Sequence, residues 1–221
     1  TGRDHLAMTR REELALNLAA VQSRITNPSV TLIVVTKTYP ASDVQILHEL
    51  GVRNFGENRN EEGLEKSSVV DGTWHFQGEI QSRKLKDIAH WADVVHSLDT
   101  ASHISKLDSV ATRKIDVFLQ LSLDADPSRG GVTESGLPAL ADLVSNSTHL
   151  TLKGLMCVPP LAAEPRAAFT EIAEIHRRFI KNFPGATSLS AGMSGDFEIA
   201  VDCGATHIRV GSSILGSRTV R

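Results

Sequence analysis

The sequence predicts a single α/β domain built as a closed (β/α)8 barrel, the TIM-barrel architecture. Eight short strand-like runs alternate along the chain with eight segments of helical periodicity, which is the pattern of a parallel sheet joined by crossover helices. The chain has 221 residues, of which 41% are hydrophobic, and barrels of this class commonly fold as one domain at such a length. No linker-like segment separates the units. An open, doubly wound sheet is the alternative that the same alternation allows.

The first half is expected to contain an opening helix and four strand–helix pairs. Apolar residues recur at helical spacing over residues 11–25, which predicts an amphipathic helix. Pro40 should end the first strand, and Ser42 with Gln45 has the spacing of a helix capping box. The four pairs are expected at 31–36 and 42–50, 53–57 and 59–67, 73–78 and 83–91, and 93–98 and 101–111.

Four further pairs complete the expected barrel. Gly51 and Gly204 suit helix C-termini, because glycine accepts the left-handed backbone found there. The longest irregular stretch, DADPSRGG at 124–131, follows a strand on the face where such barrels carry their chemistry, so we expect it to form a mobile edge of a site. The four pairs are expected at 114–123 and 134–145, 150–158 and 164–180, 187–190 and 195–204, and 207–211 and 212–216.

Composition excludes several classes of partner. With 23 Lys and Arg against 26 Asp and Glu, the formal net charge is -3, so no general attraction to nucleic acid or to an anionic membrane is expected. No apolar run reaches the ~18 residues of a membrane helix and no signal peptide is recognised, which favours a cytoplasmic protein. Cys157 and Cys203 lack the spacing of a metal or redox motif, and the nine histidines lack ligand spacing, so neither a disulfide nor a metal is expected.

Residues 1–8 carry no periodic pattern and are interpreted as an expression scar or a disordered N-terminus, which leaves 9–221 as the domain.

Lys37 raises the functional question. It follows an apolar run that should be a buried strand, although lysine is rarely buried unless it is paired or chemically useful. In a barrel the strand C-termini carry the chemistry, and residues at or just beyond those ends are Lys37, Asn58, His75 and Arg209. Desolvation in an apolar mouth would favour the neutral amine, which is the nucleophile that forms Schiff bases. The alternatives are a lysine that reaches solvent or one that pairs with Glu57.

Two Gly/Ser runs predict a phosphate site. Both follow the last two strands and precede short helices, and the loops after strands 7 and 8 are the usual phosphate site of this fold. The Ser194 hydroxyl and backbone N–H groups would form the anion cup. Turns use the same residue types, so each run alone is weak evidence. A phosphate opposite a Schiff-base lysine suggests pyridoxal 5′-phosphate or a sugar-phosphate aldehyde. The runs comprise Gly192, Met193, Ser194 and Gly195, and Gly211, Ser212 and Ser213.

Arg209 distinguishes those two ligands. A guanidinium donates hydrogen bonds but does not accept them, so beside a pyridine nitrogen it would keep that nitrogen unprotonated and the ring a poor electron sink. The alternative for Arg209 is an ion pair with a carboxylate such as Asp202. For His75 the alternative is a hydrogen-bonded position inside the barrel.

The chain resembles a known family at six stretches that run in the family's order from about residue 31 to 218: VTKTYP, FGEN, WHFQGEIQSRK, LKGLMCVPP, LSAGMSGDFEIAVDCG and HIRVGSSILGSR. The family is that of the pyridoxal-phosphate homeostasis proteins, also called YggS-like or PROSC-like, relatives of the barrel domain of alanine racemase. The resemblance implies an alanine racemase N-terminal-domain-like barrel that holds pyridoxal 5′-phosphate as an internal aldimine on Lys37. Tyr39 and the 124–131 loop depart from the commoner forms of the family.

The site residues that the resemblance implies surround the cofactor on three sides. Arg209 would lie near the pyridine nitrogen, and Asn58 and the His75 region would line the ring. The phosphate would be surrounded by Met193, Ser194, Gly195, Gly211 and Ser212.

Function is expected to be that of a cofactor binder or carrier with little or no racemase turnover. A racemase needs a base on each face of the bound amino acid, and the resemblance implies that alanine racemase takes its second base from a tyrosine on a domain that this chain lacks. The single tyrosine, Tyr39, follows Lys37 closely and is interpreted as a rim or packing residue. Alternatives are a slow amino-acid racemase and a cofactor-free Schiff-base aldolase. Expected partners are the cofactor and the apo-enzymes that use it, with the chain a monomer or weak homodimer.

Overall fold

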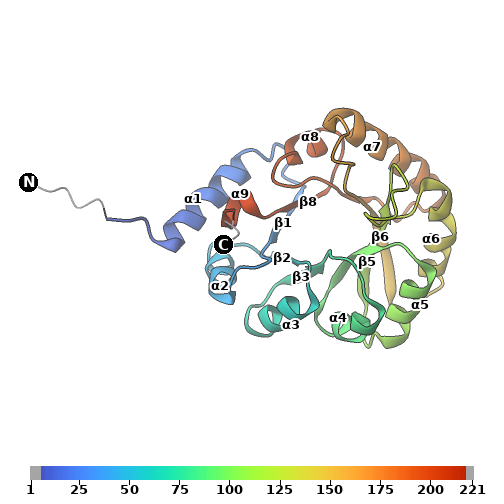
Figure 1. The fold of residues 1–221 in the computed structure, drawn as a ribbon, viewed down its shortest axis with the longest axis horizontal. Helices are drawn as coiled ribbons and strands as arrows, with labels where there is room; N and C mark the ends of the chain where they lie inside the picture. The colour runs from blue at the N-terminus through green and yellow to red at the C-terminus, as the bar shows by residue number, and fades with distance from the viewer. Residues whose placement is uncertain (1–5, 218–221) are drawn as a thin grey trace, which may run out of the picture.

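The computed structural model describes residues 6–217 as a closed barrel of eight parallel strands that neighbour one another in sequence order (Figure 1). Strands β1 and β8 pair in register from Thr31 with His207 to Val34 with Val210, and this pairing rules out the open sheet. All eight predicted strands are confirmed. Their bounds are β1 Thr31–Val35, β2 Asn54–Glu57, β3 Thr73–Phe76, β4 Val94–Leu98, β5 Ile115–Leu121, β6 Leu150–Cys157, β7 Ser188–Ser190 and β8 His207–Val210.

Helices surround the strands on the outside of the barrel (Figure 1). The opening helix α1 lies beside α9, where the Asn17 side chain donates to the carbonyl of Ile214 at 2.9 Å. The α-helices are α1 Arg10–Ser23, α2 Ala41–Glu49, α3 Asn60–Val69, α4 Leu85–Trp91, α5 Ala101–Val110, α6 Leu137–Ser145, α7 Pro165–Asn182, α8 Phe197–Asp202 and α9 Ser212–Leu215. Single 3-10 turns, η1 Ser82–Lys84 and η2 Glu134–Gly136, lead into α4 and α6.

The starts and ends of the helices were predicted only in part. The capping box expected at Ser42 is wrong, because α2 begins one residue earlier with Pro40 as a cap that makes no side-chain hydrogen bond. A capping box stands instead at the start of α1, between Thr9 and Glu12. The predicted left-handed glycines after α2 and α8 are confirmed, with φ values of +104° at Gly51 and +114° at Gly204.

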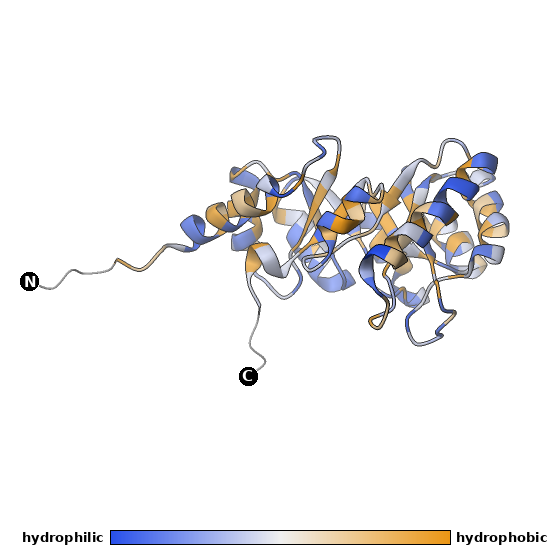
Figure 2. Cartoon of the chain, turned by 90° about the horizontal axis from the view of Figure 1, so that it is seen from above, coloured by the Kyte–Doolittle hydropathy of each residue, from blue (hydrophilic) through white to orange (hydrophobic). Residues whose placement is uncertain are grey.

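The main hydrophobic core joins buried residues of the strands with buried residues of the surrounding helices. Hydrophobic and hydrophilic residues both occur along the helices (Figure 2). Inside the barrel a second, smaller apolar cluster joins Val94, Phe118 and Met156 from β4, β5 and β6. The barrel interior is only partly apolar, and the polar side chains that form the site occupy other positions in it.

Three further observations bear on the sequence predictions. Cys157 is buried, Cys203 is partly exposed and both are free thiols; burial raises the pKa of Cys157 to about 12. Residues 1–5 lie outside the described part, so the interpretation of 1–8 stays a prediction. Within residues 6–217, no helix is both long and apolar enough to cross a membrane.

Candidate functional site

Lys37 lies in the turn that follows β1, at the end of the barrel where the strands finish. Its side chain is exposed, and within the described residues it makes no hydrogen bond or ion pair. The expectation of a desolvated lysine is therefore wrong for this structure. The alternative pair with Glu57 is also wrong, because the Glu57 carboxylate binds Lys66 instead, at 2.7 Å.

The backbone on both sides of Lys37 is held by a buried ion network. Lys66 of α3 is 3% exposed, and its ammonium donates to Glu57 Oε1 at 2.7 Å and to the Thr36 carbonyl at 2.8 Å. The Thr36 hydroxyl donates to the same Glu57 oxygen at 2.5 Å. Burial is the main cause that raises the pKa of Glu57, while Lys66 acts in the opposite direction.

The network continues past Lys37. Glu62 Oε1 accepts from Lys66 at 3.2 Å and from the backbone N–H of Thr38 at 2.7 Å. Thr38 adopts φ +68°, a left-handed conformation that a β-branched residue adopts only when its surroundings impose it. Because Thr36 and Thr38 are both tied to the same charge cluster, the Lys37 side chain starts from a fixed backbone.

Arg209 lies inside the barrel on β8 and is 3% exposed. Its guanidinium donates to Ser190 Oγ at 2.9 Å and to the Cys157 carbonyl at 3.5 Å. No carboxylate pairs with it among the described residues, and the alternative partner Asp202 binds Arg166 instead, at 3.4 Å. Desolvation lowers the pKa of Arg209 to about 10, so the group is still a cation at pH 7.

A hydrogen-bonded chain crosses the barrel from Arg209 to β2. Ser190 Oγ lies 2.9 Å from His96 Nδ1, and His96 Nε2 lies 2.8 Å from His75 Nδ1. His75 Nε2 then lies 2.9 Å from Asn54 Oδ1. Since β4 and β7 are not neighbours in the sheet, the step from His96 to Ser190 passes through the barrel interior.

One direction of donation satisfies every atom of this chain. A guanidinium only donates, so Ser190 Oγ accepts from Arg209 and its own proton is free for His96 Nδ1. His96 Nε2–H then donates to His75, and His75 Nε2–H donates to the Asn54 oxygen. Burial lowers the pKa of His75 to about 3 and that of His96 well below its usual range, which keeps both rings neutral, as this arrangement requires.

His75 therefore occupies the position that the alternative interpretation gave it. It is 2% exposed, and both ring nitrogens are engaged inside the barrel. Sequence reasoning named His75 but missed His96 and Ser190. A signal was present, because polar residues at inward-facing strand positions mark a polar interior.

The two predicted phosphate loops lie against each other. Ser194, after β7, accepts a hydrogen bond at its hydroxyl from the backbone N–H of Ser213, after β8, at 3.2 Å. A Cβ at Gly211 would lie 3.2 Å from the Val35 carbonyl oxygen, so the loop after β8 packs closely against β1. Ser212 is exposed next to Gly211.

The start of α8 carries a carboxylate, that of Asp196, which the prediction of a phosphate site did not take into account. The N–H of Met193 donates to Asp196 Oδ1 at 2.8 Å, and Gly195 is exposed between them. A phosphate bound here would have to share this cup with Asp196 or displace it, since like charges repel. Ser194 and the loop after β8 are thus the stronger phosphate candidates.

Asn58 and Tyr39 lie at the rim, after the neighbouring strands β2 and β1. Asn58 follows β2, and its side-chain oxygen is buried with no partner within the described residues. The Tyr39 hydroxyl donates to the Gly216 carbonyl at 2.6 Å, and its ring lies 5.4 Å from the Arg10 guanidinium. These contacts support the interpretation of Tyr39 as a packing residue.

This arrangement combines a primary amine that has no partner in the described part of the chain, a buried cation, and two Gly/Ser loops that touch at neighbouring strand ends. A carbonyl compound that also carries a phosphate and a hydrogen-bond acceptor would match all three. No group of three His, Cys, Asp or Glu side chains suited to a metal occurs between residues 6 and 217.

Comparison with protein families and curated proteins gives a consistent result. Residues 10–219 match the family described as the N-terminal domain of alanine racemase. A pyridoxal phosphate homeostasis protein of Corynebacterium glutamicum is 42% identical over 201 residues, which cover 86% of this chain and 91% of that protein. The pyridoxal phosphate homeostasis protein of Mycobacterium leprae is 37% identical, and the match covers 96% of this chain and 95% of that protein.

Solved structures agree with the sequence matches. PipY of Synechococcus elongatus, solved with PLP bound, has a TM-score of 0.85 and 33% identity, and the match covers 92% of this chain and all (100%) of PipY. Alanine racemase of Corynebacterium glutamicum has a TM-score of 0.72 at 15% identity, over 92% of this chain and 60% of that one. At that identity, the second likeness concerns the fold alone.

Proposed function

This chain belongs to the pyridoxal phosphate homeostasis proteins of the alanine racemase N-terminal domain family, and from that premise we propose that it binds pyridoxal 5′-phosphate through Lys37 and acts in the cell's homeostasis of this cofactor. The cofactor, when bound, supplies three groups: a pyridine nitrogen, a phosphate, and an aldehyde that reacts with a primary amine. PipY, solved with PLP bound, and the names of the curated relatives support the assignment of the ligand.

The residues present fit such a group. The Lys37 amine is exposed and has no partner among residues 6–217, so it is available to the aldehyde without the rupture of an ion pair to any of them. The network of Glu57, Lys66 and Glu62 fixes the backbone from which that amine projects. The Ser194 hydroxyl and the N–H groups after β8 would bind the phosphate.

The observation that carries the proposal is the buried guanidinium of Arg209. A cation that is 3% exposed and has no carboxylate partner between residues 6 and 217 is costly unless an acceptor satisfies it. Ser190 and Cys157 satisfy part of its donor capacity, at 2.9 and 3.5 Å. A pyridine nitrogen would be a further acceptor, and a protonated guanidinium opposite it would hold that nitrogen unprotonated.

We further propose that the protein carries the cofactor with little or no turnover of amino acids. An unprotonated ring is a weak electron sink. The one tyrosine in the chain is engaged with Gly216 at 2.6 Å, so it does not stand as a second base. Delivery to apo-enzymes, a cytoplasmic location and a monomeric or weakly dimeric state belong to the same proposal. A slow racemase and a cofactor-free aldolase are the competing functions.

Lys37→Ala tests the proposal. The purified protein should show the yellow absorbance of a lysine-bound cofactor, and the band should disappear in Lys37→Ala while weak, phosphate-anchored binding persists. Lys106→Ala, on the exposed side of α5, is the matched control and should stay yellow. After borohydride reduction, peptide mapping should place the cofactor's mass on Lys37.

Two results would overturn this assignment. An unchanged yellow band in Lys37→Ala would mean that another lysine holds the cofactor. Protein that stays colourless after incubation with pyridoxal 5′-phosphate would favour the aldolase function.

A further inference from the structure

A cavity opens at the barrel mouth, and neither Lys37 nor Arg209 is among the residues that line it. Its volume is about 420 Å³, which is within the usual range for small-molecule sites. It is lined from the ends of β2 to β6 and by the 127–130 part of the 124–131 loop. Asn58 is the one residue that it shares with the cofactor site proposed above.

Residues that carry unpartnered polar atoms are concentrated in the lining of this cavity. Within the described residues, five buried side-chain atoms have no hydrogen-bond partner. Four of the five belong to residues that line this cavity, namely Asn58 Oδ1, Gln77 Oε1, Ser97 Oγ and His103 Nδ1. Ser97 is only 5% exposed. Because buried polar atoms are normally satisfied, such a concentration indicates a ligand site.

The unpartnered atoms are mainly acceptors. The side-chain oxygens of Asn58 and Gln77 can only accept, and the Ser97 hydroxyl and an imidazole nitrogen can also accept. They come from the ends of neighbouring strands, and Gly78 keeps two of those ends in contact, since a Cβ there would lie 2.0 Å from the Asn58 carbonyl. A ligand that satisfies this set must bring several donors.

The charges around the cavity favour a cation. Glu79 and Asp99 contribute two carboxylates to its lining, against the single guanidinium of Arg129. Arg129 is already occupied, because it donates to the carbonyls of Val158 at 3.0 Å and Pro159 at 2.7 Å. These bonds tie the 124–131 loop to the end of β6, so the loop forms a wall of the cavity.

We propose that this cavity binds a small molecule through a primary ammonium group. An ammonium carries three donors and one positive charge, which matches the unpartnered acceptors and the surplus of carboxylates. The inference goes beyond the proposed function, because it needs neither the cofactor nor Lys37. If the cofactor is bound, the amine ligand lies beside it across Asn58.

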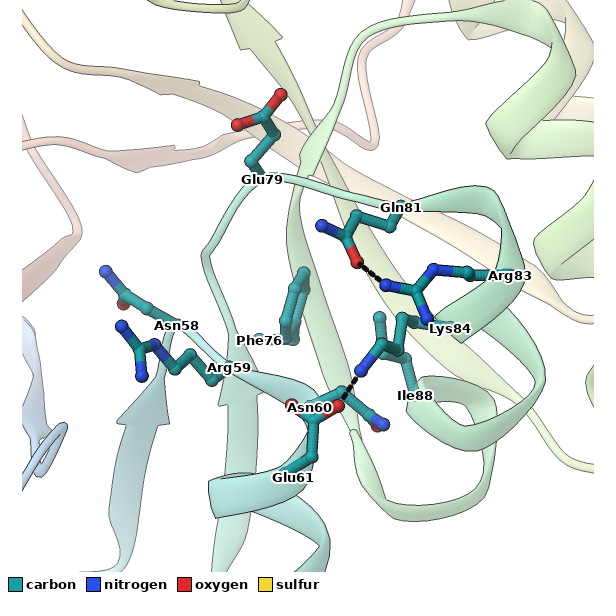
Figure 3. A pocket seen from close by; sticks show the side chains of 10 residues that line it. All are labelled: Asn58, Arg59, Asn60, Glu61, Phe76, Glu79, Gln81, Arg83, Lys84 and Ile88. Carbon is teal, nitrogen blue, oxygen red and sulfur yellow. Dashed lines mark hydrogen bonds and ion pairs between the residues drawn. The ribbon is translucent and has the colours of Figure 1, made fainter.

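The neighbouring cavity shows the contrast (Figure 3). It lies between the segments that follow β2 and β3, and three cations line it, namely Arg59, Arg83 and Lys84. Arg83 donates to Gln81 at 3.3 Å, and Lys84 pairs with Glu61. Gln81 lines this neighbouring cavity and not the proposed site. Gln81 is therefore a matched control for Gln77.

The experiment compares 2-amino-1-propanol with 1,2-propanediol, which replaces the ammonium by a hydroxyl. Binding to the full chain is measured by calorimetry and saturation-transfer NMR, on protein as purified and after borohydride treatment. Reduction fixes any cofactor irreversibly, so an amine that still binds is not reacting with the aldehyde. We expect the amine to bind both samples at least tenfold more tightly than the diol.

Variants locate the binding. Gln77→Leu and Ser97→Ala should each weaken the amine about tenfold, as expected for a lost hydrogen bond to a charged group. Gln81→Leu should leave it unchanged, as should Lys37→Ala after dialysis has removed the cofactor. Melting temperatures near that of the parent protein would show that the variants are folded.

Several outcomes would overturn the inference. Equal affinity for amine and diol would mean that the cavity holds water or any polar solute. Binding that Gln77→Leu and Ser97→Ala leave intact would lie elsewhere. Binding lost after reduction, or lost in Lys37→Ala, would be chemistry of the cofactor alone. A colourless protein that binds the amine would refute the cofactor assignment and leave this inference standing.

Discussion

Replacement of Lys66 by methionine tests whether the buried ion network positions Lys37. The change keeps most of the side chain's volume but removes the ammonium that binds Glu57 at 2.7 Å and the Thr36 carbonyl at 2.8 Å. Glu57 is 0% exposed, so its carboxylate would be left buried without a cation. Removal of one partner of such a pair costs about 3–5 kcal/mol. At roughly 2–4 °C per kcal/mol for a domain of this size, the melting temperature should fall by roughly 6–20 °C.

The loss should depend on pH in a definite direction. Burial already raises the pKa of Glu57 in the folded protein, and loss of Lys66 should raise it further. A carboxyl whose folded pKa exceeds its unfolded pKa stabilises the fold below the unfolded pKa and loses that contribution as pH rises through the folded pKa. The deficit of Lys66→Met should therefore be large at pH 8 and shrink toward pH 5.

The double variant Glu57→Gln/Lys66→Met separates stability from positioning. With the carboxylate removed, no uncompensated charge is left in the interior, so most of the unfolding free energy should return. The Thr36 carbonyl would still lack its ammonium donor, and Glu62, which binds the Thr38 N–H, would still lack its cation. Occupancy of Lys37 by pyridoxal 5′-phosphate should therefore stay low. Urea unfolding at pH 8 and pH 5 gives the first quantity, and absorbance titration with the cofactor gives the second.

Two results would refute this reasoning. A deficit below about 1 kcal/mol, or one that is the same at both pH values, would mean that Glu57 is not the group left uncompensated. A double variant that binds the cofactor as well as the parent protein would show that the network stabilises the fold without positioning Lys37.

Three further predictions concern the rest of the site. Ser194→Asp should release the cofactor on dialysis, because a carboxylate would face the phosphate; tight retention would remove Ser194 from the phosphate site. Arg209→Glu should favour a protonated ring and speed Cα–H exchange of bound L- and D-alanine at equal cofactor loading, as NMR and mass spectrometry would show. Racemisation by the parent protein at an enzyme-like rate would refute the carrier function. Burial lowers the pKa of His75 to about 3 and of His96 well below its usual range, so stability should be complete above the unfolded pKa of about 6.5 and fall by up to about 1.4 kcal/mol per pH unit per histidine below it. His96→Gln should reduce that slope in urea titrations, and an unchanged slope would contradict the assigned neutral state.

Much of the site could be predicted because strand ends in a parallel barrel converge whatever their separation in sequence. That rule brought Lys37 and Arg209 to one side of the mouth, and the contact of Ser194 with Ser213 at 3.2 Å confirms that the two Gly/Ser loops meet. Periodicity gave all eight strands. The capping box at Ser42 failed because two residues at the right spacing do not determine where a helix begins.

The partners of each charged side chain could not be predicted. Lys66 lies on α3 among residues that suggest an exposed helix face. It is nevertheless only 3% exposed, and its ammonium donates to the Glu57 carboxylate. His96 and Ser190 lie 94 positions apart in the chain and meet across the barrel. Such pairings depend on distances through the interior, which a sequence does not contain.

The sequence by itself determined the barrel, the strand ends and the residue types that face the mouth, because these follow from local periodicity and from the geometry of parallel sheets. Only the tertiary structure decided that Lys37 is exposed while Arg209 is buried without a carboxylate, and that His75 faces inward. It also decided where unpartnered acceptors collect, at Gln77 and Ser97. The physical reason is that burial and hydrogen bonding are set by every neighbour at once, and most neighbours in this barrel come from other strands.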